Sequence, residues 1–225
     1  NLADNFDMVK NEYNTLKASE VIIMHFNSEK QLTFVKTIGG GGNDWVEECT
    51  TDSKGNFYIA IGTDWLQADD FWDMGVDVYS PYRRMLVKLD KNGNLQYKTP
   101  YSNSGRAADS IYGIHLKNDK AYVVGYSYYF DGLQSKYPCQ QITKSSEDDN
   151  LFSVNTLIID NKNGKEIHRN IYRLEFDNEP SDSIMLPNGN LIIAGSLCES
   201  ENIWNIKFPA NASRIPALFM YKNLK

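Results

Sequence analysis

The side chains best suited to chemistry gather in three stretches of the chain, residues 63–83, 127–154 and 197–216. Each stretch combines aromatic rings with carboxylates, and three of the four tryptophans lie in them. An aromatic ring can pack on the C–H face of a sugar or anchor a protein partner, and a neighbouring carboxylate accepts hydrogen bonds from hydroxyl groups. With the fourth tryptophan included, the predicted ligand-binding residues are Trp45, Asp64, Trp65, Asp70, Trp72, Tyr128, Tyr129, Asp131 and Trp204.

The carboxylates of the first stretch are compatible with two further kinds of chemistry. They could supply the acid and the nucleophile of an enzyme that cleaves polysaccharide, or they could gather oxygen ligands for calcium. However, the chain contains no D-x-D-x-D-G loop and no G-x-S-x-G, H-E-x-x-H or Walker motif. The three histidines lie on different predicted strands without metal-ligand spacing. We therefore predict no catalytic residue, no metal site and no cofactor. The carboxylates in question are Asp64, Asp69, Asp70 and Asp73.

Similar apolar segments recur along the chain, and these repeats indicate how the three stretches are held. The segment 23–27 is matched 63 residues later by 86–90, and a third copy begins at 157–159. A fourth start follows at 217–221. We predict an N-terminal extension followed by repeats over 21–225, with the boundaries 1–20, about 21–63, 85–127 and 156–197, and a fourth start at 217–225.

Each repeat has the pattern of four short strands. The runs at 21–26, 32–38, 45–51 and 56–62 are rich in β-branched and aromatic residues, which favour strands. Asn, Asp, Gly and Lys separate the runs and suit tight turns. Four strands per repeat, with a period above about 40 residues, favour the blades of a β-propeller over a β-sandwich.

Three segments carry a family resemblance: the glycine-rich turn at 38–44, the hairpin at 52–63 and the strand at 85–93. They resemble the glycine-rich acidic turn, the D-x-x-G-N hairpin and the V-K-L-D-x-x-G strand of the bacterial β-propeller repeat family. The resemblance implies an all-β propeller of four-stranded blades, either a partial ring or one with few blades. It also implies that the three stretches are long insertions between the second and third strands of successive blades. The insertions would then share one face with the glycine-rich turn.

Composition narrows the possible partners. The net charge of −6 argues against nucleic acid, whose phosphates need a basic surface. Apolar runs such as 21–24 are far shorter than a transmembrane segment. The chain begins with Asn1, and together with the family resemblance this predicts an extracytoplasmic protein, secreted or on a bacterial cell surface. The odd number of cysteines excludes a full disulfide framework, although Cys139 and Cys198 could pair in an exported protein.

The sequence therefore predicts a non-catalytic binding or scaffold module that recognises a glycan or a protein partner through aromatic and acidic loops. Two alternatives remain. One is a polysaccharide hydrolase or lyase that uses the aspartates of the first insertion. The other is a purely structural repeat domain whose loops pack on themselves. The oligomeric state is left open.

Overall fold

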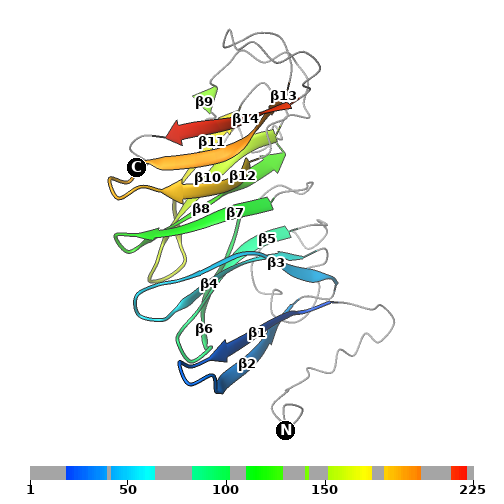
Figure 1. The fold of residues 1–225 in the computed structure, drawn as a ribbon, viewed down its shortest axis with the longest axis vertical. Helices are drawn as coiled ribbons and strands as arrows, with labels where there is room; N and C mark the ends of the chain where they lie inside the picture. Colours follow the sequence, from blue (N-terminus) through cyan, green and yellow to red (C-terminus); the bar gives the residue numbers. More distant parts are fainter. Residues whose placement is uncertain are drawn as a thin grey trace. The chain divides into compact units, whose positions relative to one another are not determined.

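A computed structural model describes residues 19–39, 42–63, 83–101, 110–128, 140–141, 152–173, 180–198 and 214–221 (Figure 1). All regular structure in these ranges is β-strand, arranged in four sheets, which confirms the predicted all-β class. The same ranges contain no helix with the length and apolar character needed to cross a membrane. The chain divides into two compact units, Asn1–Ala107 and Ala108–Lys225.

The first unit contains a two-stranded hairpin and a four-stranded antiparallel sheet. The hairpin pairs β1 (Val21–Phe26) with β2 (Leu32–Ile38). The sheet has the strand order β3 (Asp44–Thr51), β4 (Phe57–Thr63), β5 (Arg83–Leu89) and β6 (Leu95–Pro100). The first four predicted strands therefore agree with β1 to β4 to within one residue at each end.

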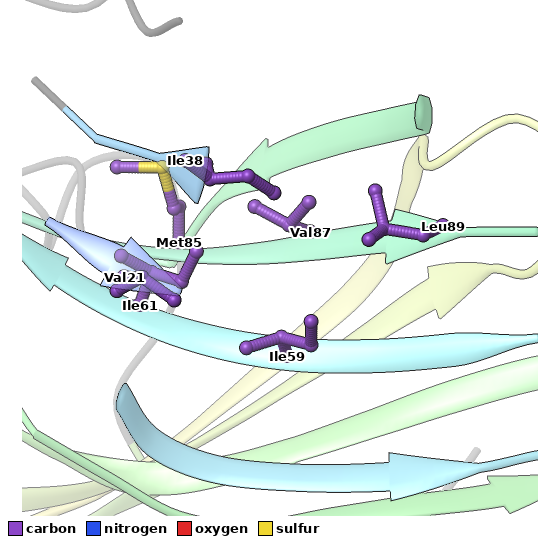
Figure 2. Close-up of a cluster of buried hydrophobic side chains, with 7 residues drawn as sticks. All are labelled: Val21, Ile38, Ile59, Ile61, Met85, Val87 and Leu89. Atoms are coloured by element: carbon purple, nitrogen blue, oxygen red, sulfur yellow. The ribbon is translucent and has the colours of Figure 1, made fainter. Parts of the chain in front are cut away.

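One face of the β3–β6 sheet packs against the hairpin and forms the core of the first unit. Alternate residues of β4 and β5 share this face because side chains alternate along a strand. Figure 2 shows them gathered with two residues of the hairpin: Ile59, Ile61, Met85, Val87 and Leu89 with Val21 and Ile38. None of the seven is more than 5% exposed. Full burial of such a side chain contributes about 1.5–3 kcal/mol, so this cluster holds the hairpin on the sheet.

The second unit contains two sheets. In the larger one, β7 (Ser110–Lys117), β8 (Lys120–Tyr128), β10 (Phe152–Asp160) and β11 (Glu166–Arg173) are antiparallel, and the short β9 (Gln140–Gln141) adds in parallel to β11. The smaller sheet has the order β12 (Pro180–Met185), β13 (Leu191–Cys198) and β14 (Arg214–Tyr221). Its core residues Leu191 and Ile193 pack with Val124 and Val154 of the larger sheet.

Two tight turns of the first unit, between β3 and β4 and between β5 and β6, share one arrangement. The carboxylates of Asp52 and Asp90 each accept hydrogen bonds from the backbone N–H groups two and four residues further on, at 2.8–2.9 Å. The third residue after each aspartate is a glycine with positive φ, 80° at Gly55 and 85° at Gly93. This conformation is accessible to glycine without steric cost, so the sequence places it where the turn requires it.

Candidate functional site

The three predicted insertions each leave and re-enter a sheet at neighbouring positions. The residues that flank an insertion are partners on adjacent antiparallel strands, so the two ends of the insertion lie side by side. The flanking pairs are Thr63 with Arg83, Tyr128 with Phe152, and Cys198 with Arg214. This confirms the predicted position of each insertion between the second and third strands of its sheet.

The insertion of the first unit emerges at the end of the sheet where β3 begins. Asp44, the first residue of β3, pairs with Thr63, the last residue before the insertion. The tight turns around Asp52 and Asp90 join the strands at their other ends. The segment before β3 and the insertion of this unit therefore meet the sheet at the same end.

The two sheets of the second unit also present their insertions at one common end. Next to the turn after β7, Lys117 Nζ donates a hydrogen bond to the carbonyl of Pro187, in the turn after β12, at 2.6 Å. Two residues before Lys117, His115 Nε2 lies 2.8 Å from Ser183 Oγ on β12. The turns of both sheets thus lie together, and the insertions leave from the opposite ends of β8 and β13.

Most of the predicted binding residues lie outside the described residues. This applies to Asp64, Trp65, Asp70, Trp72, Tyr129, Asp131 and Trp204, and also to Asp69, Asp73 and Cys139. Tyr128 is placed by its backbone at the end of β8, opposite Phe152, but its side chain is not among those described. Most of the predicted N-terminal extension, residues 1–18, is likewise outside the described ranges.

Trp45 is the predicted binding residue whose surroundings are defined. It pairs with Gly62 across β3 and β4, and a Cβ on Gly62 would lie 2.5 Å from the indole ring. The indole Nε1 donates a hydrogen bond to a Glu47 carboxylate oxygen at 3.3 Å. The guanidinium carbon of Arg84 stands 4.7 Å from the ring centroid, within cation–π range. Trp45 is therefore a half-buried ring fixed on three sides.

Glu47 and Arg84 hold Trp45, and sequence reasoning missed both residues. Glu47 is the extra residue of a β-bulge, because the register shifts between Val46 and Glu48. Its carboxylate accepts a charge-assisted hydrogen bond from Arg84 Nε, with the two side chains only 9% and 7% exposed. The available signal was a basic residue directly before the apolar residues Met85, Leu86 and Val87 of the same strand. Its partner, 37 residues away, could not be inferred from spacing.

The same end of the first unit contains a buried carboxylate, Asp44, which is 4% exposed. Its backbone N–H donates a hydrogen bond to the carbonyl of Ser19 at 2.8 Å. A Cβ on Gly39 would lie 2.6 Å from Asp44 Oδ2 and 3.0 Å from Glu20 Oε2. Gly39, the first glycine of the predicted glycine-rich turn, therefore has no room for a side chain, because the carboxylates of Asp44 and Glu20 pack against its backbone.

No cluster that could bind a metal is found in the described part of the chain. There, no group of three or more His, Cys, Asp or Glu side chains is arranged around a common point. Cys49, on β3, is an exposed free thiol. His25 packs between the rings of Phe34 and Phe57, with both ring centroids at 5.3 Å. His25 therefore belongs to an aromatic cluster of the first unit.

His115, Ser183 and Asp182 bring together the residue types of a hydrolytic triad, but their setting is that of a packing contact. A Cβ on Gly113 would lie 2.0 Å from Ser183 Oγ, so the serine is pressed against the neighbouring sheet. Asp182 accepts a hydrogen bond from the backbone N–H of Ser183 at 2.6 Å. Burial lowers the pKa of His115, and the nearby Asp182 carboxylate offsets this only in part.

Comparison with known proteins leaves the family open. The chain matches no model of a known protein family, and no curated protein sequence matches it.

Proposed function

We propose that this chain is a non-catalytic binding module built from propeller-type blades, which recognises a glycan or a protein partner outside the cytoplasm. The observation that carries the proposal is the anchoring of the insertions. In each of the three sheets with more than two strands, an aromatic and acidic insertion begins and ends on paired strand residues, at the end away from the tight turns. Loops placed in this way on a rigid frame are the usual location of binding residues.

The surroundings of Trp45 support this proposal. The ring stands beside the root of the first insertion, because its partner Gly62 is next to Thr63. Glu47 and Arg84 fix its orientation, so little side-chain freedom remains to be lost when a ligand binds. A preorganised aromatic residue increases affinity because it lowers the entropic cost of association. Trp45 would contribute one edge of the binding surface.

The propeller part of the proposal rests on the strand pattern. The β3–β6 sheet has four antiparallel strands in sequence order, as a propeller blade does. The antiparallel part of the larger sheet in the second unit repeats this order with β7, β8, β10 and β11, and β12–β14 repeat its first three strands.

A binding screen tests the function. The wild-type chain and a Trp65→Ala, Trp72→Ala double variant would be applied to a glycan array and, in parallel, used to capture proteins from cell-surface extracts. Leu95→Ala is the matched control, because it removes an exposed apolar side chain beside the turn at residues 90–94, at the opposite end of the sheet. We expect at least a tenfold loss of binding in the double variant and unchanged binding in Leu95→Ala.

Other outcomes would contradict the proposal. Equal binding by the wild type and the folded double variant would place the site elsewhere. Absence of both glycan and protein binding would favour the purely structural alternative. Release of reducing ends from a bound polysaccharide, abolished by Asp70→Asn, would show a hydrolase instead.

A further inference from the structure

Among the described residues, two apolar sheet faces are exposed, one on the first sheet along the chain and one on the last. The first is the outer face of the β1–β2 hairpin, here named the hairpin face and defined by Ile22, Met24 and Phe26. These side chains are 49%, 50% and 51% exposed. An antiparallel hairpin with one buried face normally carries polar residues on the other, so three large apolar side chains in alternate positions are informative.

The partner strand extends the hairpin face without adding charge. Ile22 pairs with Thr37 and Met24 pairs with Val35. Because directly paired residues point to the same side of a hairpin, Thr37 and Val35 line this face as well. The hairpin face is therefore an uncharged strip across two strands. The opposite face of the hairpin is already buried on the β3–β6 sheet.

The second exposed surface is the outer face of the β12–β14 sheet, here named the end-sheet face and defined by Ile184, Ile192, Leu218 and Met220. Ile184, Leu218 and Met220 are 58%, 76% and 54% exposed. Ile184, Ile192 and Met220 form one row across the three strands, because Ile192 pairs with both of the others. Leu218 lies in the next row, opposite Ala194. The row is thus a continuous apolar band on one side of the sheet.

The second unit shows how an equivalent face is covered. In its larger sheet, Tyr122 pairs with His115 on one neighbouring strand and with Ile158 on the other. Tyr122 therefore occupies the position that Ile192 occupies in the smaller sheet. Tyr122 and Ile158 are buried on that face, where β12 and β13 pack against the larger sheet. Its residues meet the smaller sheet through the contact of His115 with Ser183 and through the shared core of Val124 with Leu191.

The row that contains Tyr122 in the larger sheet is therefore covered by a second β-sheet, whereas the corresponding row that contains Ile192 is exposed. By analogy, the surface that fits the end-sheet face is an antiparallel pair of strands with large apolar side chains in alternate positions. The hairpin face is a surface of this kind on this chain. We propose that copies of the chain associate head to tail, with the hairpin face of one copy packed on the end-sheet face of the next.

The two surfaces are different, so the contact is heterologous. Each copy contributes one hairpin face and one end-sheet face, and association continues until a ring closes or an open series forms. This inference is independent of the proposed binding function, because neither surface includes a residue of the candidate site.

Complementary charge variants test the pairing. Met24→Glu disables the hairpin face and Met220→Glu disables the end-sheet face, each at a half-exposed position that tolerates a charge in the folded chain. In sedimentation velocity, the wild type should give species larger than one chain that increase with concentration. Each variant alone should remain a monomer. An equimolar mixture of the two should form dimers and nothing larger, because one functional face of each kind remains.

Ile167→Glu serves as the control, because Ile167 is 49% exposed on β11 and belongs to neither surface. It should associate as the wild type does. Self-association of either single variant would show pairing of like faces and overturn the proposal. A wild type that is monomeric at all concentrations would overturn it as well. If the wild type is monomeric and Met24→Glu lowers the melting temperature, the hairpin face and the end-sheet face of one chain pack on each other instead.

Discussion

Single residues at the contacts between strands determine much of the local geometry. Gly62 and Gly113 both lie where any Cβ would collide with a side chain of a neighbouring strand or sheet, Trp45 in one case and Ser183 in the other. Neither glycine has a positive φ. Their role is therefore close approach, in contrast to the turn glycines, whose role is conformational.

His115 should make the stability of the second unit depend on pH. Burial lowers its pKa below the ordinary histidine value of about 6.5, with Asp182 acting in the opposite direction. Ser183 on β12 and Tyr122 on β8 are its other polar neighbours. The imidazole of His115 binds a proton less tightly in the folded chain than in the unfolded chain. The contribution of neutral His115 to stability is therefore complete above the ordinary histidine pKa and is lost as the pH falls below it.

Urea unfolding at about pH 7.5 and about pH 5.5 measures this effect, since the two conditions lie on either side of the ordinary histidine pKa. The wild type should lose more stability between the two than His115→Gln, which retains a polar group beside Ser183. The hypothesis fails if His115→Gln shows the full wild-type dependence on pH.

At the scale of elements, the turns have a common design that acts on both charge and conformation. Burial raises the pKa of Asp52, but hydrogen bonds from Asn56, Lys54 and Tyr58 outweigh this effect and the net pKa is lowered. Hydrogen bonds, first of all from Asn94, also lower the pKa of Asp90. A carboxylate with a lowered pKa stabilises the fold above the ordinary aspartate pKa, and this contribution is lost as the pH falls. The turns therefore weaken in acid.

The turn of the β1–β2 hairpin provides a matched comparison with the glycine turns. The Asn27 side chain accepts hydrogen bonds from the backbone N–H groups two and four residues further on, as Asp52 and Asp90 do. The residue with positive φ in this turn is Lys30, at 61°, instead of a glycine. Lys30→Gly should raise the free energy of unfolding by roughly 0.5–1 kcal/mol, because glycine relieves the left-handed strain at some cost in chain entropy.

Gly93→Ala should have the opposite effect and lower the free energy of unfolding by about 1–3 kcal/mol. Gly93 has a φ of 85°, and the Cβ of an alanine at this position would lie 2.9 Å from the ring of Phe34. Chemical denaturation of the two variants beside the wild type measures both changes. A loss of stability in Lys30→Gly would contradict this explanation of the turns.

At the scale of the whole molecule, each compact unit contains a buried hydrophobic cluster of its own. Met85 in the first unit and Ile193 in the second are each 1% exposed. Met85→Ala and Ile193→Ala should each cost about 2–5 kcal/mol, because each removes buried apolar atoms and leaves a cavity. Their effects should add to within about 0.5 kcal/mol in the double variant, because the two residues share no core cluster.

Equilibrium unfolding of the two single variants and the double variant tests this expectation. Additive losses in the free energy of unfolding support the assignment of Met85 and Ile193 to different clusters. A coupling of more than about 1 kcal/mol between the two substitutions would contradict this assignment.

The sequence allowed the strands and turns to be predicted because their signals are local. β-Branched runs mark β1 to β4, and the residues Asp52 to Asn56 mark a turn with a defined mechanism. The surroundings of Trp45 could not be predicted in the same way. They depend on a bulge at Glu47 and on a contact with Arg84 across two strands, and neither leaves a periodic pattern. The exposed apolar faces were also hidden, since alternation alone does not show which side of a strand is covered.

The paired ends of each insertion have a consequence for how such a chain can diversify. Thr63 and Arg83 are partners on adjacent strands, so the segment between them always closes the same short gap, whatever its length. Doubling the length of a flexible loop costs only about 0.6 kcal/mol of closure entropy. Strand register is set by side-chain alternation and by the turns at the opposite end. Whole segments can thus be exchanged while the frame is kept, and one scaffold can display many recognition sequences.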